Sequence, residues 1–461
     1  MVFSSLIFLF FFLPAALFCY YIVPQKFIRV RNAVLLLFSL FFYFYGEPRL
    51  IGMLIFSILM NYLFGLSMRS TYRKPLLILC VIANLSLLGV FKYLNFFIST
   101  ADSLLGLSIP VTGIVMPIGI SFYTFQALSY VIDVYRREVP PQHDPFSLAL
   151  YVSMFPQLIA GPIVRYHDVN VQLAVRKHSF AQFSEGISRF LFGLSKKVLL
   201  SNVFAQIADG VFKYAPNELS AAGAWMGAIG YTLQITSISP ATRIWRSVSQ
   251  DVRLCVPRKL QLPVHQQAVT EFWRRWHITL GRWFRDYVYI PLGGSRKGRL
   301  RTMFNLFAVW TLTALWHGAG YNFLIWGGML LGALFLEKLF LLPFLQKSKV
   351  IGHVYLLLFV PVTWMAFTIT DVHQLGIYLT RMFPFVNAHT DMVNSMDYIK
   401  YLKDYDSLLA MGVLFATPVP AVIYGRIKRG MLGTLAIAVI FALSMYYLAV
   451  SANNPFLYFN F

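Results

Sequence analysis

The chain has 461 residues, of which 58% are hydrophobic and only 12% are charged. A soluble globular protein has about 25% charged residues, so this composition leaves too little polar surface for a water-soluble body and excludes that class. The composition therefore predicts a polytopic membrane protein. Cys19, Cys80 and Cys255 are too few and too scattered for a disulfide framework or a thiolate metal site.

The net charge of +21 is concentrated in one part of the chain. Of the 39 Lys and Arg residues, 20 lie between Arg165 and Arg301. A basic surface on a membrane protein is typical of the cytoplasmic face, which meets anionic headgroups. It also suits an anionic substrate such as a phosphorylated cofactor. Nucleic acid is the weakest interpretation, because no binding motif accompanies the charge.

Apolar runs of spanning length follow one another along the chain. The first, residues 3–23, resembles a signal peptide but lacks a charged n-region and an A-x-A cleavage site, so we expect a retained span. The others are residues 33–45, 50–68, 76–98, 111–132, 187–210, 220–236, 302–316, 320–342, 352–370, 406–424 and 431–450. Together they predict an all-α polytopic bundle of about ten to thirteen transmembrane or re-entrant helices.

Two of the apolar segments contain helix breakers. MPIGISFYTFQALSY begins near Pro117 and Gly119, and MFPQLIAGPIVRY holds Pro156, Gly161 and Pro162. Proline removes a backbone donor, so such segments persist at membrane depth only when they are buried in protein or line a wet cavity. We expect re-entrant elements around a cavity. A plain bundle of kinked helices is the alternative.

The segment EFWRRWHITLGRWFRDYVYIPLGGSRKGR, residues 271–299, mixes aromatic and basic residues. A helix from Glu271 to about Phe284 would place Trp273, Trp276 and His277 within one turn, with Leu280 continuing the stripe. Such a mixture suits a headgroup interface, where rings and guanidinium groups both find partners. PLGGSRKGR is expected to form a basic turn. An interfacial anchoring helix without chemistry remains the alternative at this point.

A single histidine, His317, interrupts the apolar run LTALWHGAGYNFLIW. An imidazole is costly to charge in such surroundings and costly to bury unpaired, so a functional role facing protein or water is expected. A neutral imidazole exchanges a proton near neutral pH, as a general base must. Gly318 and Gly320 would allow backbone or substrate to approach closely. A structural histidine bonded to a neighbouring carbonyl is the alternative.

Several familiar catalytic motifs are missing from the sequence. It contains no HExxH motif and no cysteine or carboxylate cluster, so no metal site is expected. It also lacks a Walker-type loop, a GxSxG elbow and a GxGxxG loop. ATP hydrolysis and serine hydrolase chemistry therefore lack their residues.

Four segments together resemble the membrane-bound O-acyltransferase family, in particular the bacterial branch that contains the alginate O-acetyltransferase membrane subunit. The closing NPFLYFNF is also similar to the end of family members, and the four matches lie between Pro117 and Gly328. They are PIGISFYTFQALSYVIDVYR, MFPQLIAGPIVRY, TEFWRRWHITLGRWFRDYVYIPLGG and LTALWHGAGYNFLIWGG. The resemblance implies one membrane domain over residues 1–461, with helices around a central tunnel.

The resemblance also implies an activity and a site. His317 falls on the catalytic histidine and His277 on a second candidate. Candidates for contacting substrate or lining the tunnel are Trp276, Arg285, Asp286, Trp316 and Asn322. The implied activity is transfer of acetyl groups from a cytoplasmic donor, acetyl-CoA, with no bound cofactor. A periplasmic acetyltransferase would complete delivery to an exopolysaccharide, alginate above others.

The resemblance leaves some alternatives open. Cellulose and peptidoglycan acetylation and D-alanyl transfer occur within the same class, and a transporter that makes no bonds is the rival class. A bacterial inner-membrane location in contact with lipid is implied, without nucleic acid as a partner.

Residues 236–267 depart from the family pattern. This stretch is polar and basic where the family has text similar to YFDFSGYSDMAIG and FPENFNYPY. A coding sequence that fits Thr236 to Val248 gives YFDFSGYSDMAIG when it is read one nucleotide earlier. A coding sequence that fits VPRKLQLP, residues 256–263, gives FPENFNYP in a second shifted frame, when it is read one nucleotide later. We therefore suspect a compensated frameshift that opens near Ile235 and closes near Gln267.

Overall fold

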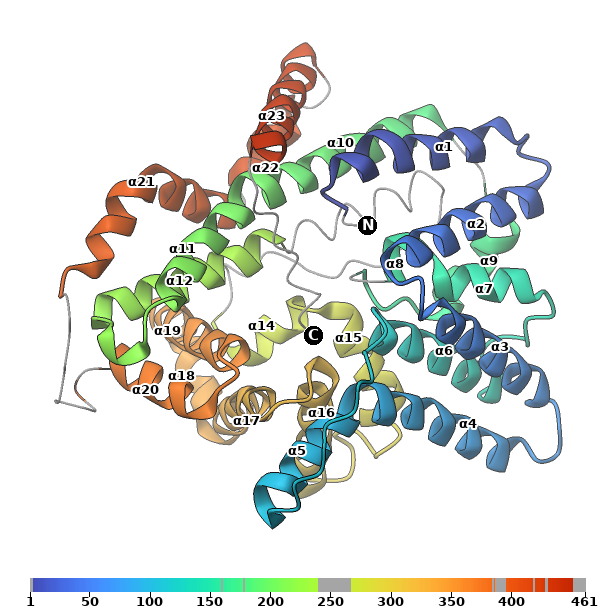
Figure 1. Cartoon of the computed structure of the whole chain (residues 1–461), viewed down its shortest axis with the longest axis horizontal. Coiled ribbons are helices and arrows are strands. Elements are labelled where there is room, and N and C mark those ends of the chain that lie inside the picture. Colours follow the sequence, from blue (N-terminus) through green and yellow to red (C-terminus); the bar gives the residue numbers. More distant parts are fainter. Residues whose placement is uncertain are drawn as a thin grey trace.

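A computed structural model describes residues 3–158, 161–176, 179–238, 267–383, 385, 395–417, 419–427 and 430–450. Within these ranges every regular element is a helix (Figure 1). Five stretches are long and apolar enough to cross a membrane: Ile28–Gly46, Arg73–Leu105, Tyr321–Lys347, Lys349–Thr368 and Met431–Val450. Two shorter apolar stretches, Phe8–Ile22 and Ile51–Ser67, accompany them. The predicted class, an all-α multi-pass membrane protein, is confirmed.

The N-terminal helices form one packed group (Figure 1). Its helix α6 contacts α3, α4, α7 and α9. The members of the group are η1 (Phe8–Phe12), α1 (Leu13–Ile22), α2 (Ile28–Gly46), α3 (Ile51–Ser67), α4 (Arg73–Leu88), η2 (Gly89–Tyr93), α5 (Leu94–Leu105), α6 (Ile120–Tyr135), α7 (Pro145–Ser153), α8 (Phe155–Leu158) and α9 (Tyr166–Ala174).

The remaining helices form a second group and the connection between the two. Of these, α11 packs on α12, and α17 packs on α16 and α19. In chain order, these helices begin with α10 (Phe180–Ser195), η3 (Lys196–Ser201), α11 (Asn202–Phe212), η4 (Pro216–Glu218), α12 (Ala221–Ile238), α14 (Val269–Arg275), α15 (Ile278–Phe284), η7 (Arg285–Tyr289) and α16 (Arg299–His317). The chain continues through α17 (Tyr321–Leu336), η8 (Glu337–Leu341), α18 (Leu342–Lys347), α19 (Lys349–Thr368), α20 (Val372–Met382), α21 (Asp397–Ala416), α22 (Val419–Ile427) and α23 (Met431–Val450).

Two large apolar cores correspond to these groups. One gathers side chains from the N-terminal helices, and the other gathers side chains from α11, α12, α17, α19 and α20. The segment 269–284 contributes to both, because Trp276 belongs to the second core and Trp283 to the first. In Figure 1, α14 and α15 accordingly lie between the two groups. This segment joins the halves of the molecule.

The two segments with helix breakers are enclosed by protein. Gly119 adopts φ +77°, which glycine tolerates without strain, and α6 begins directly after it as a continuous helix. Every side chain from Ile120 to Val131 is buried. In the second segment, Pro156 and Pro162 are also buried, and α8 (Phe155–Leu158) is a single helical turn. The described residues of both segments thus meet one of the two conditions for such backbone at membrane depth, burial in protein, and the re-entrant path stays a prediction.

Candidate active site

Two histidines from separate helices lie side by side at the boundary of the two cores. The ring centroids of His277 and His317 are 6.1 Å apart, and the rings are nearly perpendicular, at 82°. His277 is 7% exposed, and His317 is partly buried. Trp316 contacts both rings, with centroids 5.7 Å from His277 and 4.9 Å from His317. The structure thus brings together the two histidines singled out in the sequence.

Aromatic side chains enclose His317. Besides Trp316, the rings of Trp326 and Phe367 lie 4.9 and 5.3 Å from its ring, centroid to centroid, and both stand edge-on to it. These two side chains belong to the second core, whereas Trp316 belongs to the first. An imidazole in such surroundings is shielded from water, and this suits acyl transfer because hydrolysis competes with it.

The helix expected over 271–284 is broken at His277, which corrects the prediction. α14 ends at Arg275, α15 starts at Ile278, and His277 between them adopts φ +44° and ψ +44°. This left-handed conformation is uncommon for a residue other than glycine and costs about 1–2 kcal/mol. The break replaces the single predicted stripe, so Trp276 faces one core and Leu280 the other.

A buried carboxylate holds the start of α14. Glu337, fully buried in η8, accepts hydrogen bonds from the backbone N–H groups of Val269 and Thr270, at 2.6 and 2.9 Å. The Thr270 hydroxyl adds a third bond at 2.6 Å. These donors would otherwise lack partners at a helix N-terminus, where a negative charge is also favourable. Glu337 therefore fixes the helix that leads to His277.

The tight connection between α16 and α17 follows His317 directly. A Cβ added to Gly318 would lie 2.0 Å from Cε2 of Phe323, so only glycine fits there. Asn322, 1% exposed, donates a 3.1 Å hydrogen bond to the backbone carbonyl of Phe367, whose ring contacts His317. The sequence predicted that backbone or substrate approaches these glycines, whereas the group that lies against Gly318 is the side-chain ring of Phe323.

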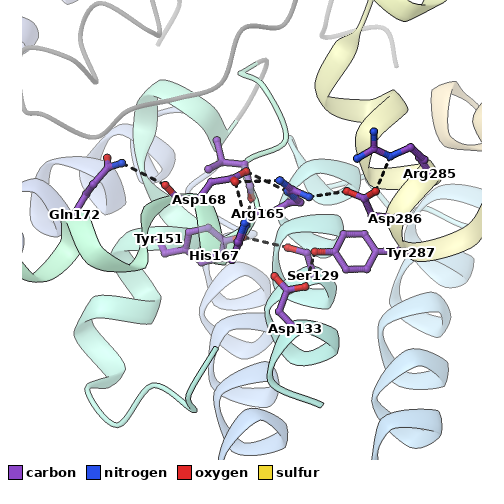
Figure 2. Close-up of polar contacts among 11 residues, drawn as sticks. Ser129, Asp133, Tyr151, Arg165, His167, Asp168, Gln172, Arg285, Asp286 and Tyr287 are labelled. Atoms are coloured by element: carbon purple, nitrogen blue, oxygen red, sulfur yellow. Dashed lines mark hydrogen bonds and ion pairs between the residues drawn. The ribbon is translucent and has the colours of Figure 1, made fainter. Parts of the chain in front are cut away.

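The other predicted contact residues differ in their surroundings. Trp276 stacks on Phe272 at 5.4 Å and packs against Trp364 at 5.7 Å, within the second core. Arg285 and Asp286 instead belong to a polar network with the loop before α9 (Figure 2). Of these residues, Trp316 contacts both histidine rings, whereas Trp276 packs in the second core. Arg285 and Asp286 belong to the polar network instead.

Asp286 lies between two arginines in this network. Arg165 Nη1 donates to Asp286 at 2.6 Å and Arg285 Nε donates to it at 2.7 Å, while Arg165 also makes two bonds to Asp168 (Figure 2). Burial alone would lower the pKa of Arg165, but the bond and charge of Asp168 and the charge of Asp286 raise it. The guanidinium therefore stays charged and ties η7 to α9.

Four contributors to the site and its surroundings were not expected: Lys92, Ser121, Arg165 and Phe367. Lys92 Nζ lies 2.5 Å from the backbone carbonyl oxygen of Trp316 and 3.1 Å from Ser121 Oγ. Lys92 interrupts the apolar run 76–98 as His317 interrupts its own run, so the same cost of burying a polar group could have marked it. For the other three, nothing in the local sequence distinguishes them. Among the described residues, no group of His, Cys, Asp and Glu side chains could hold a metal ion.

The fold and the site define a class: a multi-pass membrane protein of helices with two aromatic-enclosed histidines at its centre. Comparison with known proteins gives the family. The model of the membrane-bound O-acyltransferase family matches residues 40–378, and the chain belongs to this family. It is accordingly an O-acyltransferase.

Relatives match over much or all of the chain. The "Probable alginate O-acetylase AlgI" of Pseudomonas putida is 35% identical over the full length of both proteins. The protein of the same name from Pseudomonas aeruginosa is 40% identical over 71% of this chain and 64% of its own. The "Peptidoglycan O-acetyltransferase" of Helicobacter pylori is 34% identical over 71% of this chain and 68% of its own.

Proposed function

We propose that the protein transfers acetyl groups from cytoplasmic acetyl-CoA toward an exopolysaccharide, alginate, across a bacterial inner membrane. The observation that carries this proposal is the histidine pair in its aromatic enclosure, in a chain whose relatives named for alginate O-acetylation match it along its whole length. A periplasmic acetyltransferase would pass the acetyl group from this protein to the polymer.

The chemistry assigns His317 the role of general base. Its neutral imidazole would take the proton of an attacking hydroxyl while the hydroxyl oxygen attacks the thioester carbonyl. The carbon–sulfur bond then breaks, and the thiol of coenzyme A leaves with the proton. His277, whose ring centroid lies 6.1 Å from that of His317, is the second residue close enough to contact the reacting groups.

Contacts between basic residues support an orientation for this transfer. Arg69 meets His143 at 2.9 Å, Arg73 lies over the ring of Tyr135, and Arg136 bonds to the Asp286 carbonyl at 3.0 Å. The ends of α3 and α6, the start of α4 and η7 therefore share one basic face. The positive-inside rule assigns this face to the cytoplasm, where the phosphates of coenzyme A would meet it.

The path from this face to the site suits a transfer across the bilayer. α16 starts at Arg299, directly after the basic turn, and ends at His317. Its 19 residues rise about 27 Å, close to the thickness of the hydrocarbon core. His317 therefore lies deep relative to the basic face, and the predicted tunnel would connect the two.

The test is the loss of acetyl from the secreted polymer. His317→Ala, expressed in an alginate-producing host that lacks its own membrane subunit, should lower polymer-bound acetate at least about a hundredfold. The protein should still be present in the membrane fraction. The control is His373→Ala, which removes an exposed histidine of α20 and should leave acetylation unchanged. Full acetylation with His317→Ala would overturn the proposal.

Peptidoglycan is the second candidate acceptor, because the Helicobacter pylori relative carries that name. The same strains distinguish the two acceptors when ester-linked acetate is measured on both polymers. Acetate that depends on His317 should appear on alginate. If it appears on peptidoglycan alone, the acceptor in the proposal is wrong.

A further inference from the structure

Two side chains of a neighbouring span cover the end of the helix that carries His317. α16 ends at His317, so its last carbonyl groups lack partners within the helix. The Leu315 carbonyl accepts a hydrogen bond from the Tyr93 hydroxyl, and the Trp316 carbonyl accepts one from Lys92 Nζ at 2.5 Å. The Ala314 carbonyl is met locally, by the Gly318 N–H at 3.4 Å.

Lys92 belongs to a stretch where a charge is costly. It lies in the continuous helical stretch Arg73–Leu105, an apolar candidate span of 33 residues. A lysine within an apolar span is costly, by up to about 2.5–3.5 kcal/mol at the bilayer centre on insertion scales, so its presence requires compensation. The compensation here is specific, because the ammonium group meets a helix C-terminus, where the backbone dipole favours a cation.

A π-helical turn presents both side chains to the same helix end. η2 spans Gly89–Tyr93, between α4 and α5, and contains Lys92 and Tyr93 as consecutive residues. Such wide turns are rare and are found frequently at functional sites. Here two neighbouring residues reach two successive carbonyls, those of Leu315 and Trp316.

Ser121 closes a ring of contacts around the same point. Its hydroxyl accepts the second hydrogen bond of Lys92, at 3.1 Å, and its backbone carbonyl accepts the indole N–H of Trp316, at 3.4 Å. Lys92, Ser121 and Trp316 thus connect η2, the first turn of α6 and the end of α16. Trp316 in turn packs against both histidine rings.

We propose that Lys92, supported by Tyr93, is a positioning residue for acyl transfer that fixes the end of α16 and with it the His317 imidazole. This role rests on the proposed function of His317 as the base. Lys92 acts through the Trp316 carbonyl, and its ammonium also stabilises the dipole of α16. A shift of about 1 Å in a catalytic group can cost about a hundredfold in rate, so the loss of this clamp is expected to lower kcat.

The test compares variants of the full chain purified in detergent. The rate of acetyl transfer from radiolabelled acetyl-CoA is measured and divided by the amount of monodisperse protein. Lys92→Met keeps the length of the side chain but removes the ammonium, and should lower kcat about 10- to 100-fold. KM for acetyl-CoA should change less than about threefold, because Lys92 is proposed to position His317 and not to bind the substrate. Tyr93→Phe should lower kcat by a smaller factor.

Two further variants separate positioning from general damage. Lys92→Arg keeps the charge and the donors and should exceed Lys92→Met in kcat about tenfold. Lys213→Met removes an exposed lysine at the end of α11, outside the proposed basic face, and should match the wild type. Equal activity of Lys92→Met and wild type, or no recovery with Lys92→Arg, would overturn the role of Lys92.

A measurement that needs no substrate tests whether Lys92 fixes the end of α16, independently of the proposed function. Hydrogen–deuterium exchange over residues 311–321 should be at least about tenfold faster in Lys92→Met and, if that variant does not fold, in Tyr93→Phe. Unchanged exchange in the variant that folds would overturn the clamp. If the chain transfers no acetyl even with its reading frames over residues 236–267 restored, or if His317→Ala is fully active, the proposed function fails instead.

Discussion

The ring of His277 stands perpendicular to the ring of His317 with 6.1 Å between the two centroids, although 40 positions separate them in the chain. Each histidine lies at a helix end: His277 between α14 and α15, and His317 at the end of α16. The buried Glu337 carboxylate secures the start of α14, and the partly buried Lys92 secures the end of α16. The pair is therefore held by contacts outside its own segments.

The backbone of His277 gives a prediction about stability. Its φ of +44° is tolerated by asparagine far better than by a β-branched residue. His277→Val should therefore lower the free energy of unfolding by about 1–2 kcal/mol relative to His277→Asn. Thermal unfolding in detergent, followed by tryptophan fluorescence, measures this difference. Both variants lose the imidazole, so both should lose activity. Equal stability of the two would show that the left-handed conformation is not required.

The space beside Gly318 gives a second prediction. Its φ of −171° is ordinary extended backbone, so the obstacle to a side chain is steric: the Phe323 ring lies 2.0 Å from the position that a Cβ would take. Gly318→Ala should cost about 1–3 kcal/mol of stability and displace the ring that packs on Phe367. Gly328→Ala is the control, since a Cβ there meets nothing within 4 Å, and it should be neutral or stabilise α17 by up to about 1 kcal/mol.

Comparing these two variants requires unfolding midpoints and acetyl transfer measured on the same samples. Loss of transfer with Gly318→Ala and retention with Gly328→Ala is the expected result. If Gly318→Ala kept full stability, the close packing of α16 against α17 after His317 would be refuted.

The bond between Arg165 and Asp286 gives a third prediction. The two side chains are 19% and 15% exposed, and their bond of 2.6 Å joins η7 to the loop before α9. Asp286→Ala should cost about 1–3 kcal/mol, because a charged donor loses a partly buried acceptor. The control is Glu185→Ala, whose partner Arg189 is more exposed, with an expected cost of about 0–0.5 kcal/mol.

This third prediction also decides between two roles for Asp286. The sequence suggested contact with substrate, whereas the structure surrounds the carboxylate with arginines of the protein. In Asp286→Ala, a rise in KM for acetyl-CoA without loss of stability would show that Asp286 contacts the substrate. A lowered unfolding midpoint with KM unchanged is what the network predicts.

Hydropathy and family-like segments were enough to predict the helical class and to select His277 and His317. Both signals are local, since an apolar run predicts a helix and a polar residue within it is costly wherever the run lies. The break at His277 was not predictable in this way, because the spacing of Trp273, Trp276 and Leu280 favours one continuous helix. The break is imposed by packing, which directs Trp276 and Trp283 into different cores.

The contacts of Lys92, Glu337 and Arg165 could not be predicted either. Each reaches a partner more than 60 positions away in the chain. A charged residue in an apolar run indicates that a partner exists, but its identity depends on the three-dimensional arrangement. The surroundings of Asp286 could not be foreseen for the same reason.

The last prediction concerns residues 236–267, which lie outside the described residues except for 236–238 and Gln267. As the sequence stands, they include Arg243, Arg246, Arg253, Arg258 and Lys259. Each basic residue at the centre of a bilayer costs about 2.5–3.5 kcal/mol, so the sequence of this stretch suits a span less well than the family text does. Sequencing the gene on both strands should reveal a shift that opens near Ile235, a change of frame between Val248 and Val256, and a closing shift near Gln267.

A repaired chain tests the consequence for activity. Restoring the two shifted reading frames, which encode YFDFSGYSDMAIG and FPENFNYP, should raise acetyl transfer well above that of the unrepaired chain in the same host. Adding His317→Ala to the repaired chain should abolish the gain, because the repair restores the surroundings of the base and not a second activity. An unshifted gene that encodes residues 236–267 as they stand, together with full activity of the unrepaired chain, would refute the frameshift.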